Sequence, residues 1–274
     1  MLNYYGPATK QHRRHEVASA RKANLRSVTV IAAMLFAVPA TASEAHQNNS
    51  VLSIVVGSFQ VKNATMEEVL RALRATNLTR ILIGFENVSH HAGDKKRTMS
   101  LSVANATVGE ILDGMCRSDK RYRYETIDGL LVHVYPKDRQ NDTFGLLGIR
   151  VKKFSVDDKI LPAAIIERIG ELAPELASYL TEKQNEYFRQ RGIVPSFPGI
   201  TTHGNLDPQV SLHLHDMTIR EVLNATVLYS LRLNQETAPD WAGNKIPPTS
   251  WMYEFVVDPA APTGLGGYAK WVAF

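Results

Sequence analysis

One junction occurs three times in this chain, and it constrains the fold more than any other feature. Each copy reads as a short alternating strand, an Asn or Asp turn, and the start of a helix. The copies align without gaps over residues 58–70, 100–112 and 211–223. A repeated strand-to-helix junction predicts a mixed α and β protein built from equivalent units.

The helix start in each copy carries a capping box. In this device a Thr side chain accepts from an amide of the first turn, and a Glu three residues later accepts from the N–H of the Thr itself. The pairs are Thr65/Glu68, Thr107/Glu110 and Thr218/Glu221. Apolar residues then recur at helical spacing, so each helix is predicted to pack one narrow apolar face on a sheet.

Further strands complete the pattern. In the first half they are predicted at residues 80–85, 122–127 and 130–135, the last two joined by the hairpin sequence Asp128-Gly129. The second half has predicted strands at 151–156 and 251–257, and a helix that opens at Pro162 and carries Ile165, Ile169, Leu172 and Leu176. We therefore expect an α+β fold of two tandem small sandwiches of the βαβ-βαββ type, with helices on small mixed sheets.

Residues 1–42 are interpreted as a secretory signal peptide. A basic stretch ends at Arg26, an apolar run covers 28–38, and Ala40-Thr41-Ala42 fits the small-residue rule for cleavage. Cleavage is expected after Ala42 or, alternatively, after Ala45. The apolar run is shorter than a membrane-spanning helix requires. An uncleaved leader would instead act as an N-terminal membrane anchor.

The net charge of +4 belongs to this leader. Residues 1–42 contain six basic side chains and one acidic one, which leaves 25 basic and 26 acidic side chains in the rest of the chain. The segment Arg121-Tyr122-Arg123-Tyr124 interleaves basic and aromatic residues, as single-strand nucleic-acid binders do. On a strand, however, the tyrosines share one face and the arginines the other. We therefore expect no nucleic-acid partner.

The exported part is predicted to comprise two modules. The first covers residues 50–137 and a linker covers 138–148; the second, more divergent module covers 149–258, with a long loop at 184–209, and a Pro/Gly-rich tail covers 259–274. The first module has 12 basic and 9 acidic side chains, and the second has 11 and 14. Our hypothesis is that this opposite charge helps the modules to dock on each other, or to stack head to tail between chains.

The repeated pattern resembles a known family. Strand, Asn/Asp, x, Thr, apolar, x, Glu, apolar, Leu, followed by a helix and a closing hairpin, is similar to the short secretin and TonB-receptor N-terminal domain (STN) and the N-domains of secretin channels. Residues 54–137 match the whole module, and 149–258 match in part, from Ser211 on. The resemblance implies a small periplasmic α+β sandwich of diderm bacteria that makes protein–protein contacts and has no catalytic residues. The chain departs from the usual architecture, because no barrel or channel domain follows residue 258.

Two histidines are the best candidates for chemistry. His213 and His215 lie two apart on a predicted strand, so their rings share one face and could chelate a metal. A third ligand could come from His203 or Asp207 in the preceding loop. The equivalent positions in the other copies are Gln60/Lys62 and Ser102/Ala104, the solvent-side residues of their strands. We interpret both histidines as surface residues.

The remaining candidates have structural explanations. His90-His91 is predicted to lie in a solvated loop, His133 to be an ordinary strand residue, and Cys116 to be a buried, unreactive thiol on the second helix. Glu67/Glu68 and Glu171/Glu175 are explained by capping or solvation. The sequence contains no hydrolase, phosphate-loop or dinucleotide motif. No catalytic, cofactor-binding or metal-binding residue is assigned, and no cofactor is expected.

The expected function is therefore that of a non-catalytic, exported interaction module of the cell envelope, with no membrane span in the mature chain. It would serve a secretin-type channel or a TonB-dependent system, and contact an envelope protein or a second copy of itself through sheet edges or outer helix faces. The alternative is a periplasmic metal- or ligand-binding protein, or a hydrolase, that uses His213, His215 and the 192–208 loop.

Metal analysis distinguishes these two functions. The purified mature chain, loaded with Zn²⁺ and dialysed, is expected to retain no stoichiometric metal, because we interpret both histidines as surface residues and two ligands alone do not complete a zinc site. Elemental mass spectrometry gives the metal content, with His213→Ala as the control. Stoichiometric zinc that is lost in His213→Ala would favour the alternative.

Overall fold

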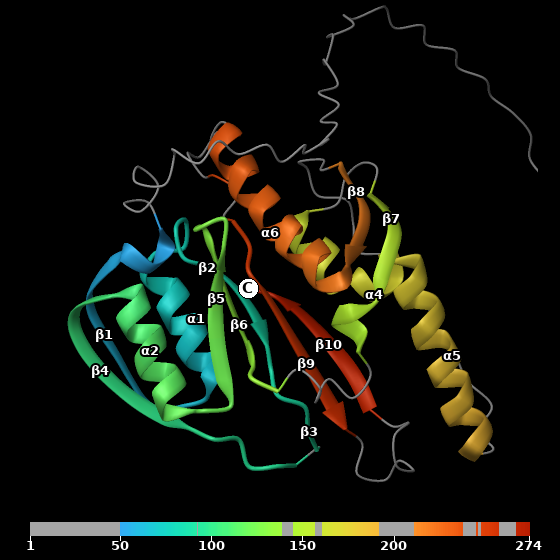
Figure 1. Ribbon diagram of the computed structural model, residues 1–274, viewed down its shortest axis with the longest axis horizontal. Coiled ribbons are helices and arrows are strands. Elements are labelled where there is room, and N and C mark those ends of the chain that lie inside the picture. The colour runs from blue at the N-terminus through green and yellow to red at the C-terminus, as the bar shows by residue number, and fades with distance from the viewer. Residues whose placement is uncertain are drawn as a thin grey trace, which may run out of the picture. The chain divides into compact units, whose positions relative to one another are not determined.

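The described part of the chain contains both strands and helices, interspersed from residue 50 on (Figure 1). The computed structural model describes residues 50–91, 93–138, 145–156, 161–191, 211–237, 245, 248–257 and 267–274. The signal peptide predicted for 1–42 and the loop at 192–208 lie outside these residues. Within them, no helix combines the length and apolar character needed to cross a membrane.

The elements have the following bounds. The strands are β1 (Val55–Ala64), β2 (Leu82–Glu86), β3 (His90–His91), β4 (Met99–Thr107), β5 (Tyr122–Ile127), β6 (Leu131–Pro136), β7 (Arg150–Val156), β8 (Leu212–Thr218), β9 (Trp251–Val257) and β10 (Gly267–Ala273). The helices are η2 (Val51–Ser53), α1 (Met66–Thr76), α2 (Val108–Ser118), η4 (Leu146–Gly148), α3 (Pro162–Glu167), α4 (Ile169–Leu172), α5 (Pro174–Arg191) and α6 (Ile219–Glu236). The expected α+β class is confirmed.

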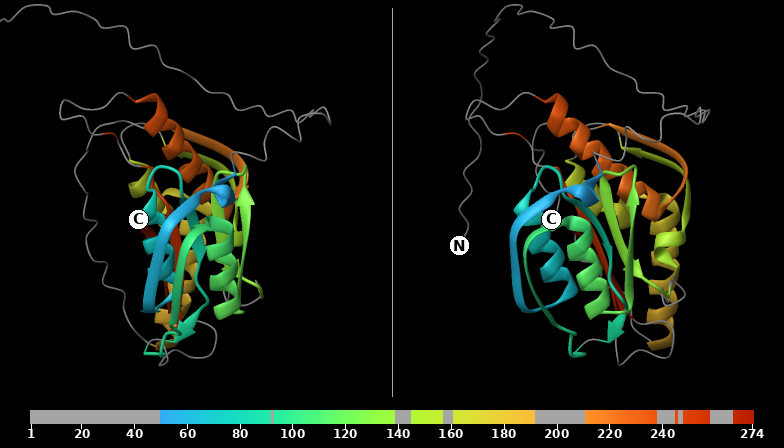
Figure 2. Two further views of the ribbon diagram at one scale, coloured as in Figure 1. Left: turned by 90° about the vertical axis from the view of Figure 1, so that its left-hand side faces the viewer. Right: turned by 60° about the vertical axis from the view of Figure 1, so that its left-hand side comes forward.

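The layers alternate in the order β-α-β-α-β. An outer sheet of β1 and β4 covers α1 and α2, which pack on one face of a 6-stranded central sheet (Figure 1). Helices α3 and α6 pack on the other side of that sheet, and a second outer sheet of β7 and β8 packs against α6. In the left view of Figure 2 the β1–β4 sheet faces the reader.

All three predicted capping boxes are present. In each, the Thr side chain accepts from the backbone of the Glu three residues on, and the Glu accepts from the Thr N–H. The predicted turn before each cap is also confirmed, because Asn63, Asn105 and Asp216 have φ values of 52°, 52° and 56°. Asn and Asp enter this left-handed region more readily than other side chains do. Each of these helices therefore begins in the same way.

The two outer sheets are built alike. Strands β1 and β4 pair antiparallel, and so do β7 and β8. In the first sheet the Val108 N–H donates to the Ile54 carbonyl at 2.9 Å; in the second the Ile219 N–H donates to the Ile149 carbonyl at 3.0 Å. The first amide of a helix lacks a partner within the helix. In both halves the residue before the first strand supplies that partner.

The central sheet joins the two halves. Its strand order is β10-β9-β2-β6-β5, with β3 paired to β9. Strand β2 runs parallel to β6 of its own half and to β9 of the second half. The two halves thus share one sheet, whereas the sequence predicted a separate sandwich for each. The reason is that all of β2 is buried, so a first half on its own would leave an apolar edge strand open.

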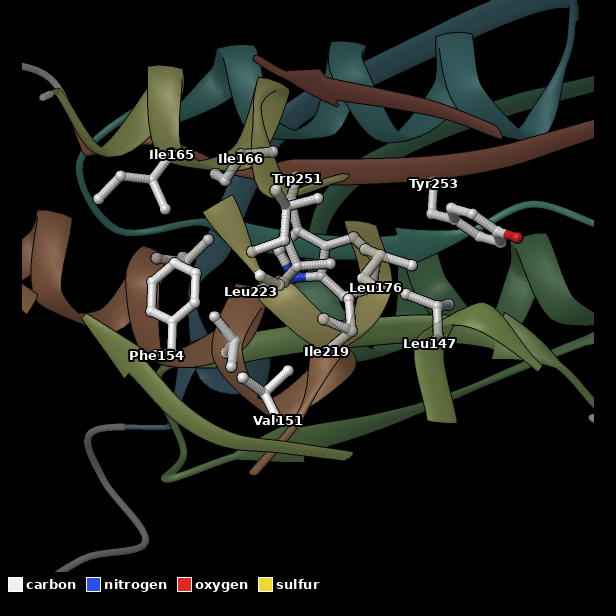
Figure 3. Close-up of a cluster of buried hydrophobic side chains, with 14 of the residues drawn as sticks. Leu147, Val151, Phe154, Ile165, Ile166, Leu176, Ile219, Leu223, Trp251 and Tyr253 are labelled. Carbon is white, nitrogen blue, oxygen red and sulfur yellow. The ribbon is translucent and has the colours of Figure 1, made fainter. Parts of the chain in front are cut away.

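Neighbouring residues on the central strands enter different cores, as expected for a sheet covered on both faces. Ile83, Phe85 and Met252 belong to the core that contains α1 and α2. Leu82 and Trp251 belong to the core that contains α3 and α6. Figure 3 shows Trp251 at the centre of this second core, with Ile219 and Leu223 of α6 beside it.

Three predicted irregular segments contain ordered structure. The predicted tail at 259–274 is wrong for residues 267–273, which form β10 and pair with β9 along its whole length. The predicted linker at 138–148 is wrong at its end, because Leu146 and Leu147 are buried under α6. The predicted loop at 184–209 is wrong up to Arg191, where α5 ends. That stretch has no Gly or Pro until Gly192, so nothing stops the helix earlier.

The helix predicted from Pro162 is confirmed at its start but is broken further on. Arg168 leaves helical geometry at φ −107° and ψ 15°, and Ala173 is extended at φ −95° and ψ 107°. Ala173 precedes Pro174, whose ring disfavours a helical conformation in the residue before it. Ile165, Ile169 and Leu176 are buried despite the breaks.

Replacing Gly84 tests the contact between the halves. Gly84 pairs with Trp251, and a Cβ at Gly84 would lie 2.8 Å from Cε2 and Nε1 of that ring. Gly84→Ala is expected to lower the free energy of unfolding by about 1–3 kcal/mol, because the buried ring cannot move aside. Urea titration followed by circular dichroism measures it. Gly57→Ala in β1 is the control, since nothing lies within 4 Å of its Cβ; an equal effect of both variants would contradict the prediction.

Candidate functional site

The candidate metal ligands lie on the outward side of β8. His213 and His215 are exposed and pair with Ser155 and Lys153 of β7. The Nδ1 atom of His213 is 2.7 Å from the Ser155 hydroxyl oxygen. Across the residues that the structure describes, no group of three or more His, Cys, Asp or Glu side chains is placed to hold a metal ion. His203 and Asp207 lie outside those residues, so the metal hypothesis stays a prediction.

The other predicted residues have different outcomes. His90 and His91 form β3 and pair with the end of β9, so the predicted loop is wrong there; the open edge of β9 accepts them. Cys116 is half-buried, and this burial raises the pKa of its thiol, in line with the predicted unreactive side chain. The alternation in β5 is confirmed, because Tyr122 is buried and Arg123 is exposed.

His133 belongs to a buried ionic cluster that the sequence analysis missed. Its Nε2 lies 2.8 Å from Oε1 of Glu86, at the end of β2, and its Nδ1 lies 3.3 Å from Oε1 of Glu125 on β5. Arg220, in the first turn of α6, donates to both carboxylate oxygens of Glu86, with Nη2 to Oε2 at 3.0 Å. Glu86 thereby links β6 of its own half to α6 of the second half.

The cluster keeps Glu86 ionised. Burial acts against the charged form, but the hydrogen bonds from His133 and Arg220 and their nearby charges outweigh it, so the pKa of Glu86 falls from 4.5 to about 2. The side chains of His133 and Glu86 are 0% and 6% exposed. Because both side chains are buried, a ligand in solution does not reach them. The role of the cluster is to join the two halves through the bond between Glu86 and Arg220.

A cavity of about 300 Å³ lies at the start of α1. Its walls come from segments 65–67, 87–90 and 94–97 and from Arg121 and Tyr122. The lining contains more cations than anions: the cations are Lys95, Lys96, Arg97 and Arg121, and the anions are Glu67 and Asp94. The cavity adjoins the end of the β1–β4 sheet where Ala64 pairs with Met99, since Thr65 directly follows β1 and Arg97 lies two residues before β4.

The floor of this cavity is a satisfied polar network. The Tyr122 hydroxyl donates to Oδ1 of Asn87 at 2.5 Å, and Nδ2 of Asn87 donates to Oε1 of Glu254 at 3.0 Å. Lys96 donates to the same Glu254 oxygen at 3.2 Å. Burial, its largest cause, raises the pKa of Tyr122 to about 12, so the phenol stays neutral and remains a donor. These hydrogen bonds fix Asn87, Lys96 and Tyr122 of the lining around Glu254.

The strand edges differ in their protection against pairing. Strand β4 contains neither a charged residue nor Pro over its nine residues. Every other long edge strand of the described sheets carries at least one charge; examples are Lys62 in β1, Arg123 in β5, Lys153 in β7 and Lys270 in β10. Charge and Pro are common means of blocking an edge. Strand β4 is therefore the edge most open to a further strand.

The ionic cluster makes a pH-dependent contribution to stability. Because the pKa of Glu86 is lowered on folding, this contribution is complete above pH 4.5 and is lost as the pH falls towards about 2. Glu86→Gln is expected to lower the free energy of unfolding by about 3 kcal/mol at pH 6, and by clearly less at pH 3. Urea titrations at both pH values measure the difference from wild type.

The control for this experiment is Glu171→Gln. Glu171 pairs with Arg168, but both side chains are substantially exposed, at 60% and 44%. An exposed pair of this kind is expected to change stability by less than about 1 kcal/mol. A Glu86→Gln effect that is as large at pH 3 as at pH 6 would mean that the ionised carboxylate is not its source.

Comparisons of the chain with models of protein families, with curated proteins and with solved structures found no match. The resemblance to STN domains therefore rests on the repeated pattern of the sequence. The structure adds to that pattern the three capped helix starts and their left-handed turn residues. The candidate site consists of the open edge of β4 and the cationic cavity beside it, and it is identified from the structure alone.

Proposed function

We propose that this chain is a non-catalytic protein–protein interaction module, exported to the periplasm and related to the STN domains. It serves an envelope assembly such as a secretin-type channel or a TonB-dependent system. It binds its partner, an envelope protein or a second copy of the chain, by accepting a strand along the edge of β4.

The observation that carries this proposal is the open edge of β4. In the described sheets β4 pairs with β1 on one side alone. An unpaired edge presents a row of N–H and C=O groups that an extended segment of another protein can pair with. With nine residues and no charge or Pro, β4 is long enough for several such hydrogen bonds.

The side chains on β4 favour this use of its edge. Ser100, Ser102 and Ala104 are exposed on the outer face and are small, so they do not obstruct an added strand. The opposite face is fixed, because Met99 and Ala106 are buried against α1 and α2. A partner would therefore meet a rigid strand and would order mainly its own segment.

The leader supports the proposed compartment. A basic segment, an apolar run too short to span a membrane, and small residues before Ala42 are the three parts of an export signal. An export signal and the STN-like pattern both favour the periplasm. The partner sought is accordingly a protein of the cell envelope.

Site-specific photocrosslinking in the native cells tests the proposal. Ser102 of β4 and, separately, Lys153 of β7 are replaced by p-benzoylphenylalanine; both are exposed mid-strand positions on outer sheets. A discrete adduct is expected from position 102 and not from 153, because the second outer sheet carries charges along its edges. Mass spectrometry identifies the adduct.

Each outcome bears on the proposal. An adduct with a protein exported to the envelope, or with a second copy of the chain, supports it. An adduct from position 153 alone would place the contact on the other outer sheet and contradict the role of β4. No adduct from either position, with the exported chain present at normal levels, would contradict the interaction function itself.

A further inference from the structure

The cavity beside β4 has the chemistry of an anion site, and this inference rests on the function proposed above. Three of its four cations follow one another in the segment that leads into β4, namely Lys95, Lys96 and Arg97. The fourth, Arg121, comes from the turn before β5. Two separate segments of the chain thus contribute positive charge to this cavity.

The cations differ in whether they are already paired. Lys96 is bonded to Glu254, and Arg121 forms a bidentate pair with Asp119 through Nε and Nη2 at 2.9 and 2.6 Å. Lys95 and Arg97 are exposed, and among the described residues neither has an ion-pair partner within 4 Å, although the charge of Arg97 helps to lower the pKa of Asp119. These two are therefore the groups that an incoming anion would meet.

The acidic groups of the lining are also engaged. Glu67 pairs with Arg71 at 3.1 Å, and Oδ2 of Asp94 accepts from the His91 N–H at 2.8 Å. Asp94 holds the turn that leads into the cationic segment, so it supports the position of Lys95. Asp94 keeps its negative charge, because its hydrogen-bond donor is a neutral amide. Lys95 and Arg97 therefore outnumber it by two charges to one.

The size and position of the cavity limit its ligand. A volume of about 300 Å³ is at the lower end of the range for ligand pockets, so it suits one or two side chains. It adjoins the Met99 end of β4, where a strand added to that edge would begin or end. Part of an extended peptide matches both the volume of the cavity and its position at the end of β4.

We propose that the cavity binds carboxylate side chains of an acidic segment in the protein partner, with Lys95 and Arg97 as the recognising residues. Arg guanidinium groups form paired hydrogen bonds with carboxylates, and Lys adds a point charge. The acidic end of the segment enters the cavity while the rest pairs with β4. The cavity thereby fixes which end of the added strand lies at Met99.

A peptide-binding experiment tests this proposal. The probe is a fluorescein-labelled peptide of alternating Thr and Val with Asp-Glu at one end, and the matched probe carries Asn-Gln instead. Fluorescence anisotropy with the full mature chain is expected to show tighter binding of the acidic probe. The double variant Lys95→Ala/Arg97→Ala is expected to weaken that binding about tenfold and to leave the binding of the amide probe unchanged.

The control is Arg80→Ala/Lys153→Ala, which removes the same charge from two exposed positions outside the cavity. Equal weakening by both double variants would show a general effect of net charge and overturn the proposal. Equal binding of the two probes by wild type would also overturn it. Thermal melts followed by circular dichroism check that both variants fold.

Inorganic phosphate tests whether the cavity acts together with the β4 edge. At equal ionic strength, phosphate is expected to compete with the acidic probe better than chloride does, because Arg pairs with phosphate as it does with carboxylate, and to leave the binding of the amide probe unchanged. Displacement of both probes alike would overturn the assignment of the cavity to the acidic end of a peptide. If neither probe binds while the crosslink from Ser102 forms, the carboxylate site is wrong and the interaction function stands. If both experiments are negative, both proposals fail.

Discussion

The parallel pairing of β2 with β9 is the contact on which the rest of the structure depends. It joins strands β2, β6 and β5 of the first half to β9 and β10 of the second half in one sheet, both faces of which are covered by helices. The pairing requires Gly84, because the ring of Trp251 occupies the space where a side chain would be. Trp251 in turn donates to Asn224 of α6 at 2.9 Å, so the same residue links the strand contact to the helix above it.

The ionic cluster lies at this same junction. Buried ion pairs offer less net stability than apolar packing of equal size, but an unpaired partner left behind is costly. Arg220 can satisfy Glu86 only when α6 sits at one position over the sheet, because both carboxylate oxygens are engaged. The apolar core supplies the bulk of the stabilisation, and the cluster restricts how the two halves can be arranged.

Local structure could be predicted well from the sequence. The capping boxes, the left-handed Asn and Asp residues and the Asp128-Gly129 hairpin depend on side chains within a few residues of one another. The β2–β9 pairing could not be predicted, because any apolar strand can pair with any other and nothing local selects the partner. Strand β10 was missed for the same reason: a Pro/Gly-rich composition describes the segment before it, whereas Tyr268–Ala273 gains its order from β9.

The site was harder to predict than the fold. His133 interrupts an otherwise apolar strand in the run Leu-Val-His-Val-Tyr, and Glu86 is a buried charge at the end of the run Leu-Ile-Gly-Phe-Glu. A polar residue within a doubly buried strand is a signal that could have been followed. The cavity gives no such signal, since the fold alone brings Lys95–Arg97, which precede β4, together with Arg121, which precedes β5. Charged residues are common in loops, and whether several of them cluster at one site depends on the tertiary structure.

The shared central sheet has a consequence for how such a chain can change over generations. Proteins built from independently folded domains can lose, gain or exchange a domain, because each domain has its own hydrophobic core. Here the helix starts repeat locally, yet the two halves that carry them share hydrogen-bonded backbone in one sheet. Deleting one half would expose the interior of the other, so the two halves are expected to be kept or lost together.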